Sequence, residues 1–329
     1  MKIIVDAFGG DNAPLEIIKG CALAVEDLGI EVILTGDKNI IKKTAIENGI
    51  SLNNIRVVHT DVVISPDDDA SAVVKEKKNS SMGMGFQLLN SGEGDAFVSA
   101  GNSGALVMGS SLIIKRIKGV KRPAFAPVMP KAQGCFMLVD GGANNEVRPD
   151  MLQQFAIMGS IYMNKVMEID NPRVGLANVG TEEHKGGSLQ QEAFELLKTT
   201  PINFIGNVEG RDIPADGCDV LVTDGFNGNL ILKTYEGVAM ELMSKIKSVF
   251  MKNVKNKIAA AMIMSDLKKL AKEMDYNEYG GAAIMGVNKP VFKAHGSSKA
   301  KTIKSALRLT KQFVEGGVVE EISTNIAKL

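Results

Sequence analysis

Short runs of aliphatic and β-branched residues alternate with helical patterns through the first half of the chain. The runs predict strands at residues 3–5, 32–34, 55–58 and 96–98, with helices at 15–28, 38–47, around 86–89 and at 105–116. Strands separated by helical patterns of roughly 10–15 residues indicate βαβ units. The pattern therefore predicts an α/β fold with a mostly parallel sheet flanked by helices.

The pattern changes once and then resumes. Residues 125–128 and 135–139 are joined by a turn-like segment, which predicts an antiparallel hairpin inserted in the sheet. Beyond it, the pattern predicts helices at 151–167 and 189–197, strands at 174–177, 204–205 and 220–222, and helices from Leu230 onward. No linker-like segment separates two domains, so we expect residues 1–329 to form a single unit of two lobes that share one continuous sheet.

Most predicted strands end in glycine and small polar residues. These strand ends are Asp6, 99–104, 140–144, 178–181, 207–211 and 223–229. Ligands of open α/β sheets bind beyond the carboxyl ends of the strands, where free backbone N–H groups suit a phosphate or carboxylate. The alternative for any one loop is that Gly and Asn only form turns. The repetition of the pattern favours a common anion site.

Composition and charge exclude several classes of function. The 38 basic and 38 acidic residues balance, which argues against a general polyanion binder. Aromatic residues make up 5% of the chain, too few for base stacking, so we expect no nucleic-acid partner. Three cysteines without metal-like spacing predict neither disulfides nor a metal site.

No P-loop or complete dinucleotide motif is present, and no cofactor is expected. Asp6 interrupts what would be the apolar region of a signal peptide, which predicts a cytoplasmic protein.

Candidate catalytic groups lie in polar loops. No serine or cysteine nucleophile motif is evident, and His184 and His295 lie in glycine-rich loops where either could line a site. Lys185 belongs to an ionisable cluster after a strand and could hold an anion or stabilise an oxyanion, or it could simply lie at an exposed helix start. Asn229 could donate a hydrogen bond to a substrate, or it could cap a helix.

Residues 241–274 carry eight lysines against three acids, together with an apolar stripe that ends in the apolar tip 258–264. The spacing predicts a protruding amphipathic helical pair over 235–275, which could lie on an anionic membrane or meet an acidic partner. The alternative is an ordinary pair packed on the core or in a dimer, and the stripe could pair while the tip stays exposed. A second basic cluster at 115–122 is either a solvated face or a docking site for an acidic carrier protein.

Taken together, the loops resemble those of the PlsX-type phosphate acyltransferases of bacterial phospholipid synthesis. The resemblance spans nearly the whole chain in order, and its blocks are 5–14, 99–105, 142–144, 178–180, 185–186, 206–211, 224–226, 228–229, 280–282 and 295–298. It implies an isocitrate/isopropylmalate dehydrogenase-like and phosphotransacetylase-like fold and a homodimer. It also implies transfer of an acyl group from acyl carrier protein to inorganic phosphate. The family's catalytic Lys and Asn map onto Lys185 and Asn229.

The loops and the resemblance together give a set of expected site residues. Those expected to bind phosphate or substrate are Asp6, Gly10, Asn12, Asn102, Ser103, Gly104, Asn144, Asn178, Asn207, Arg211, Asp224 and His295, with Asn102 and Ser103 foremost. Ile258, Met262 and Ile263 are expected to touch the inner face of the cell membrane, and the next acyltransferase of the pathway is a further candidate partner. Bound phosphate would attack the thioester itself, since alignment and oxyanion stabilisation suffice without a covalent intermediate.

Some positions depart from the family's pattern. Gly stands at 141–142 where an apolar residue is expected, Thr181 replaces Gly, His184 precedes the lysine and Ala283 replaces Pro. The alternative function on the same architecture is a metal- and NAD(P)-dependent hydroxyacid dehydrogenase, which would need a dinucleotide site and clustered carboxylates.

Overall fold

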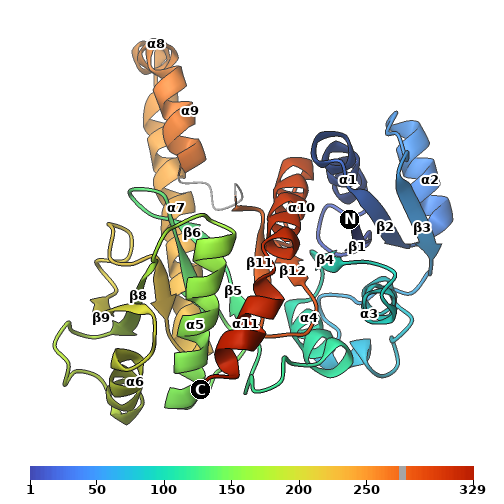
Figure 1. Cartoon of the computed structure of the whole chain (residues 1–329). Helices are drawn as coiled ribbons and strands as arrows, with labels where there is room; N and C mark the ends of the chain where they lie inside the picture. Colours follow the sequence, from blue (N-terminus) through green and yellow to red (C-terminus); the bar gives the residue numbers. More distant parts are fainter. Residues whose placement is uncertain (274–278) are drawn as a thin grey trace.

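The computed structural model describes residues 1–273 and 279–329; of residues 270–273 it describes the backbone only. The chain forms two α/β lobes side by side and a helical projection (Figure 1). The first lobe contains a seven-stranded sheet in the order β3 (Ile55–His59), β2 (Glu31–Gly36), β1 (Lys2–Asp6), β4 (Ala96–Ser99), β12 (Val291–Ala294), β11 (Gly281–Met285), β5 (Ala124–Ala126). In this sheet β11 runs antiparallel to its neighbours and the other strands are parallel to one another.

The second lobe contains a five-stranded sheet. Its order is β6 (Val128–Pro130), β7 (Cys135–Val139), β10 (Val220–Val222), β8 (Arg173–Asn178), β9 (Asn203–Glu209). Here β6 is antiparallel to β7 and the remaining pairs are parallel. The antiparallel pairing of β6 with β7 forms a hairpin here, but the predicted first strand, 125–128, is wrong: its first half belongs to β5, which pairs with β11, and β6 occupies the start of the predicted turn.

Helices cover these sheets and connect the parallel strands. In the first lobe they are α1 (Leu15–Leu28), α2 (Lys38–Glu47), α3 (Ser81–Ser91), α4 (Ser103–Gly109) and α10 (Ala300–Glu315), with a 3-10 turn at Ala70–Val73 and a π-type turn at Ser110–Ile114. In the second they are α5 (Pro149–Lys165), α6 (Ser188–Lys198), α7 (Gly225–Met251) and α11 (Val318–Ile326). The mostly parallel α/β architecture predicted from the sequence is confirmed.

The predicted single sheet is wrong, because hydrogen bonding divides the strands into two sheets. The division falls at Pro127, between β5 and β6. Proline has no backbone N–H to donate to a ladder, so the segment separates into β5, which pairs with β11, and β6, which pairs with β7. The Pro127 carbonyl still accepts a hydrogen bond from the Leu138 amide at 2.9 Å, which keeps the sheets adjacent.

The hydrophobic core follows the alternation of side chains along buried strands. On β1, Ile3 and Val5 pack into one cluster and Ile4 into another, because successive residues of a strand face opposite sides of the sheet. The larger cluster continues from the first lobe into the second through α5 and α10. Tyr162 and Phe313 join those helices with ring centroids 5.9 Å apart.

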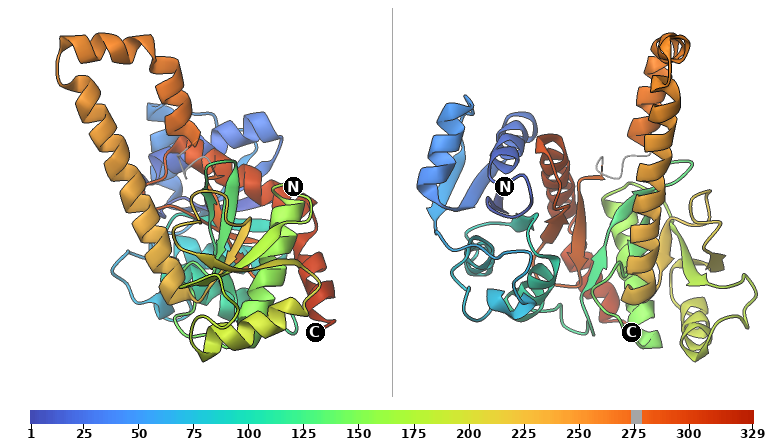
Figure 2. Two further views of the ribbon diagram at one scale, coloured as in Figure 1. Left: turned by 90° about the vertical axis from the view of Figure 1, so that its left-hand side faces the viewer. Right: turned by 180° about the vertical axis from the view of Figure 1, so that it is seen from behind.

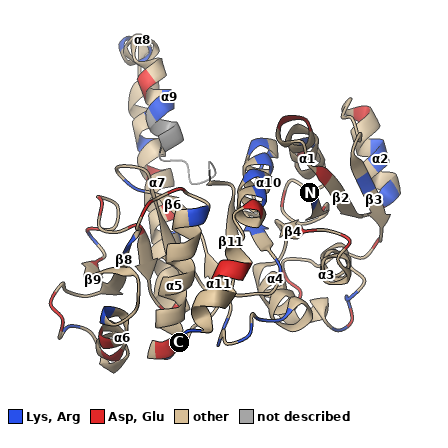
Figure 3. Ribbon diagram, in the orientation of Figure 1, with Lys and Arg blue, Asp and Glu red and all other residues tan. Residues whose placement is uncertain are grey.

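The helical projection contains three helices where a pair was predicted. The long helix α7 rises from the second lobe, α8 (Val254–Met262) crosses the end and α9 (Met264–Glu273) returns (Figure 2). We call residues 240–273 the helical arm; the end of the predicted segment, 274–275, lies outside the described residues. Lysines occur along the arm in Figure 3.

Candidate active site

Parallel strands of both sheets end beside a cavity of about 620 Å³ that lies between the lobes. The loops and helices that follow β4, β7, β10 and β12 contribute to its lining, together with β5 and β11. The position agrees with the expectation that ligands of α/β sheets bind beyond the carboxyl ends of strands. One part of the lining is polar and another is apolar.

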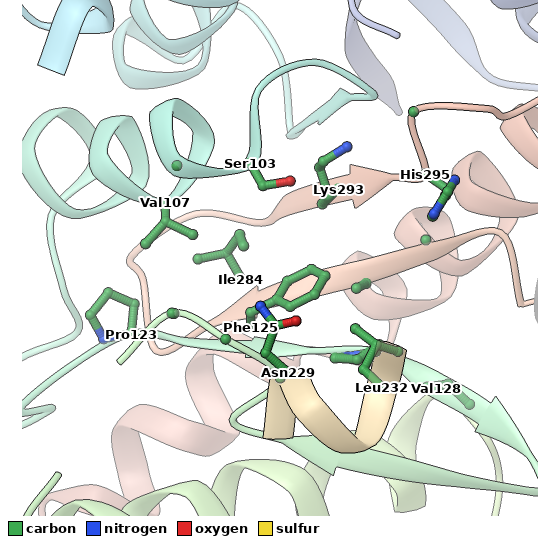
Figure 4. Close-up of a pocket in the computed structure, with 18 of the residues that line it drawn as sticks. Ser103, Val107, Pro123, Phe125, Val128, Asn229, Leu232, Ile284, Lys293 and His295 are labelled. Atoms are coloured by element: carbon green, nitrogen blue, oxygen red, sulfur yellow. The ribbon is translucent and has the colours of Figure 1, made fainter. Parts of the chain in front are cut away.

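The polar part combines residues far apart in the sequence. It includes Ser103, Asn144, Asn229, Lys293 and His295. In Figure 4, Ser103, Lys293 and His295 lie along one side of the cavity and Asn229 lies on the other. Of the residues predicted to bind substrate, the structure thus brings Ser103, Gly104, Asn144 and His295 to the cavity together with Asn229.

The apolar part lies between α4 and the strands β5 and β11. Val107, Phe125 and Ile284 face the cavity in this part (Figure 4), and the lining continues with Met108 on α4 and Leu112 in the π-type turn that follows. The cavity can therefore receive a molecule with an apolar chain at one end and a polar reacting group at the other.

The loop after β7 is held by the carboxylate of Asp140. That buried side chain accepts hydrogen bonds from the backbone amides of Gly142, Ala143 and Asn144, at 3.1, 3.0 and 2.7 Å. The Asn144 side-chain amide also donates to Asp140 at 2.8 Å. Gly142 has a φ of +135°, and a Cβ there would lie 3.0 Å from Nδ2 of Asn229. Glycine at 142 lets the loop approach Asn229 closely.

The loop after β1 supports His295 from the first lobe. Asn12 donates from Nδ2 to the Ser297 carbonyl at 3.0 Å, and the Asp11 amide donates to the Gly296 carbonyl at 2.8 Å. Gly10 has a φ of +95°, where a Cβ would meet the Gly296 carbonyl oxygen at 2.9 Å. Gly10 and Asn12, predicted as binding residues, therefore position the His295 loop and do not line the cavity themselves.

The surroundings of His295 favour one tautomer of its imidazole. Its Nδ1 accepts from the Ser297 amide at 3.3 Å and lies 2.8 Å from the Ser297 hydroxyl. An accepting Nδ1 places the proton of the neutral ring on Nε2. Burial lowers the pKa of His295 from its usual value, which favours the neutral form at pH 7.

Asp6 and Asn102 also hold the scaffold. The buried Asp6 carboxylate accepts from the Ser99 hydroxyl at 2.8 Å, and burial raises its pKa. Asn102 accepts from the Ala105 amide at 3.0 Å as the cap of α4, and its Nδ2 donates to the carbonyls of Ser65, Pro66 and Asp68. Of the two residues expected to be foremost in phosphate binding, Asn102 thus has its side chain engaged by backbone groups.

Lys185 lies in a second group of predicted residues, outside the cavity lining. Asn178 donates from Nδ2 to the Lys185 carbonyl at 3.1 Å, and Asn207 donates to the Glu182 carbonyl at 2.8 Å. Both asparagines therefore fix the backbone of the loop that carries Lys185. This loop follows β8, which pairs directly with β10, the strand that leads to Asn229.

Two further predicted residues have local partners. Arg211 is an exposed side chain that pairs with Glu209 at 2.8 Å. Asp224 caps α7 and accepts from the Asn227 amide at 2.9 Å. It thereby starts the helix that presents Asn229 one turn later.

Lys293 was missed by the sequence prediction. It lies on β12 with only 8% of its surface exposed, lines the cavity, and donates from Nζ to the carbonyls of Ala100 and Ala294 at 3.0 and 2.6 Å. Burial lowers its pKa to about 8. The run Val291–Ala294 carried the available signal, a short strand-like stretch interrupted by one lysine.

Comparison with known proteins identifies the family. A family model described as "Fatty acid synthesis protein" matches residues 1–321. A phosphate acyltransferase of Thermoanaerobacterium thermosaccharolyticum is 48% identical over 326 residues, which cover 99% of this chain and 97% of that protein. The chain belongs to the phosphate acyltransferases. A phosphate acyltransferase of Clostridioides difficile is 43% identical over 329 residues, covering 100% of this chain and 97% of the relative.

The family assignment confirms the resemblance found in the sequence and makes the chain an acyltransferase. The phosphate acyltransferase relatives do not favour the dehydrogenase alternative.

Solved structures with the same fold have low sequence identity. The EutD phosphotransacetylase from Staphylococcus aureus aligns with a TM-score of 0.61 at 17% identity, covering 95% of this chain and 94% of that one. A putative 4-hydroxythreonine-4-phosphate dehydrogenase from Salmonella typhimurium aligns with a TM-score of 0.54 at 12% identity, covering 94% and 98%. These similarities confirm the predicted phosphotransacetylase-like and dehydrogenase-like architecture.

Within the described residues, no helix combines the length and apolar character that crossing a bilayer requires.

Proposed function

We propose that this phosphate acyltransferase moves a fatty acyl group from an acyl carrier protein thioester to inorganic phosphate, giving acyl phosphate and the free carrier thiol. The observation that carries the proposal is the cavity itself, in which an apolar part suited to an acyl chain adjoins a polar part suited to an anion. The names of the relatives supply acyl group and phosphate as the substrates.

The chemistry is a single displacement. A phosphate oxygen attacks the thioester carbonyl carbon, a tetrahedral oxyanion forms, and its collapse breaks the C–S bond and releases the carrier thiolate, which takes up a proton. Asn229 donates a hydrogen bond to the oxyanion from the cavity, and Lys185 stabilises the same charge from the neighbouring strand end. Donors placed in advance at a developing oxyanion account for about 3–4 kcal/mol of a barrier.

A basic surface beside the apolar part of the cavity supports acyl carrier protein as the acyl donor. Arg122 lines the cavity and is exposed, and Lys115, Lys118 and Lys121 of the same basic cluster are also exposed. A basic surface at the entrance attracts an acidic carrier and speeds its encounter. Arg122→Glu should raise the KM for acyl carrier at low salt and leave the KM for phosphate unchanged; equal changes in both would refute this docking face.

The defining experiment follows carrier thiol release and acyl phosphate formation together. Purified protein is mixed with acyl carrier protein bearing a labelled acyl chain, with and without inorganic phosphate. The proposal expects equal amounts of thiol and acyl phosphate in the presence of phosphate, and neither without it. Thiol release that is independent of phosphate, with free fatty acid as the product, would show a thioesterase and refute the proposal.

We also propose that the helical arm touches an anionic membrane surface on the cytoplasmic side. Ile258, Met262 and Ile263 at its end are 59%, 80% and 40% exposed, and lysines of α8 and α9 flank them. Apolar side chains beside lysines suit the interface of an anionic bilayer. The next acyltransferase of the pathway remains a candidate partner at that surface.

We further propose a homodimer that buries the apolar side of α7. Leu230, Val238, Leu242 and Val249 are each at least 46% exposed along this helix. Exposed apolar side chains that follow one element mark an interaction surface. Light scattering should give the mass of two chains, reduced to one by Val238→Lys; a monomeric parent protein would refute the proposal.

A further inference from the structure

Lys293 differs from the other basic residues that line the cavity. Arg122 lies exposed in the basic cluster at the entrance, and Lys233 pairs with the Glu236 carboxylate at 2.8 Å. Lys293 is buried on β12, and within the described part of the chain no carboxylate lies within ion-pairing distance of its Nζ. A buried ammonium without an anionic partner is costly, so its retention beside a cavity needs a reason.

The hydrogen bonds of Lys293 leave donor capacity for a ligand. An ammonium group has three N–H donors. The carbonyls of Ala100 and Ala294 take two of them, and the described residues offer the third no acceptor. The two carbonyls also fix Nζ beside the turn that leads to Ser103, which reaches the same part of the cavity (Figure 4).

We propose that Lys293 is the cation that binds the attacking phosphate, with the Ser103 hydroxyl and the His295 imidazole beside it. The inference rests on the proposed function, because it assigns phosphate to the polar part of the cavity. It differs from the sequence prediction, which put Asn102 and Ser103 foremost: Ser103 keeps a place in the site, whereas Lys293 was not among the predicted residues. A phosphate oxygen would take the remaining N–H of Lys293, and the protein would gain the anionic partner that the buried ammonium lacks.

This placement also sets the positions of the two substrates relative to each other. Phosphate at Lys293 lies on one side of the cavity and Asn229 lies on the other, with the space for the thioester carbonyl between them (Figure 4). Lys293 neutralises part of the phosphate charge. Because its ammonium contacts a single phosphate oxygen, another oxygen stays free to attack the thioester.

Several charged groups face Lys293 and set its protonation. Asp6 on β1 and Asp11 in the following loop favour the ammonium form, while burial and Lys233 on α7 disfavour it, and His295 lies two residues further along the chain. Burial dominates and brings the pKa of Lys293 to about 8. An anion bound to Nζ would raise that pKa, so binding near pH 8.5 must be accompanied by proton uptake.

The first test needs no variant and no acyl donor. Sulfate serves as the probe because its own charge does not change between pH 6.5 and 8.5. Calorimetric titration of the whole protein with sulfate, in two buffers of different ionisation enthalpy, measures protons taken up on binding. The proposal expects roughly half a proton or more per sulfate at pH 8.5, where the His295 imidazole stays neutral and Lys293 is the group that takes up the proton. Sulfate binding without proton uptake at pH 8.5 would overturn it.

The second test uses steady-state kinetics. Lys293→Met should raise the phosphate KM at least tenfold, change the acyl-donor KM less than twofold and abolish the proton uptake, whereas Lys293→Arg should recover part of the phosphate affinity. Lys289→Met is the matched control, because Lys289 also donates to a backbone carbonyl, that of Leu89 at 2.7 Å, but lies outside the cavity lining.

The two tests separate this inference from the proposed function. An unchanged phosphate KM with lower kcat and lower thermal stability in Lys293→Met would show a structural role and overturn the inference, while leaving phosphate-dependent thiol release intact. Failure of the wild-type protein to form acyl phosphate would refute the proposed function, whatever the sulfate titration gives.

Discussion

At the scale of single residues, side chains with similar sequence signals have different tasks. Asn229 lines the cavity, whereas Asn102, Asn178 and Asn207 use their amides to hold backbone loops. Gly-Asn strand ends predicted where the cavity lies, because parallel strands end at one edge. They could not predict which amide faces the cavity, since that depends on partners such as the Ser65 carbonyl, far away in the sequence.

Lys185→Ala and Asn229→Ala should each lower kcat for carrier thiol release by about a hundredfold to a thousandfold, because each removes an oxyanion-stabilising group. Circular dichroism and thermal melts should match the wild type. Lys198→Ala is the control, since Lys198 is a surface lysine of α6 paired with Glu183 at 3.3 Å. Wild-type turnover in the folded Lys185 or Asn229 variant would remove that residue from the mechanism.

At the scale of elements, the first half of the chain was more predictable than the end. Strands β1 to β4 alternate with helices in a local βαβ pattern. Strands β11 and β12 were missed, because Gly281–Met285 contains few β-branched residues and finds its partners, β5 and β12, only in the folded chain. Lys293 was missed with its strand, since a lysine inside a short run ordinarily indicates an exposed position.

The helix α4 should limit the length of the acyl chain. Val107 faces the apolar part of the cavity (Figure 4). A larger side chain at this position therefore takes up space that the far end of a long acyl chain would occupy. Val107→Phe should lower kcat/KM for long acyl donors relative to short ones by roughly tenfold, and Val107→Ala should not. Competition between donors of different length measures the ratio; an unchanged ratio in Val107→Phe would place the acyl chain elsewhere.

The end of the helical arm should control membrane binding and not chemistry. Ile258→Glu and Met262→Glu each add a charge to the apolar tip, and together they should weaken sedimentation with anionic vesicles at least tenfold. Turnover with soluble substrates should stay the same, because the tip is remote from the cavity lining. Ile46→Glu is the matched control, an exposed apolar residue of α2 at 81% exposure. Undiminished vesicle binding by the double variant would refute the contact.

At the scale of the whole molecule, the second lobe has the cavity at one end of its parallel strands and a group of charged side chains at the other. The site lies at the carboxyl ends, and an ionic network lies at the start of β8 and β10. There the Lys131 ammonium and the Arg173 guanidinium donate to the Asp219 carboxylate at 2.7 and 3.1 Å, and the Arg173 backbone amide donates to it at 2.8 Å. Burial alone would raise the pKa of Asp219, but these donors lower it to about 2.

The pH dependence of the unfolding free energy in acid should show how much this ionic network contributes to stability. The folded pKa of Asp219 lies below the unfolded value, so its contribution is present above about pH 4 and lost as the pH falls toward 2. Asp219→Asn should therefore lower the unfolding free energy by about 2 kcal/mol at pH 7, and the difference should shrink near pH 2. Chemical denaturation at several pH values measures it; a difference independent of pH would contradict the assignment.

The measurement that bears most directly on the mechanism is a rapid mix of protein with acyl carrier in the absence of phosphate, followed by intact-protein mass spectrometry and thiol titration. Direct attack by phosphate predicts no carrier thiol and no protein of increased mass until phosphate is added. A burst of one thiol per active site, with protein heavier by one acyl group that then reacts with phosphate at the turnover rate, would contradict the account.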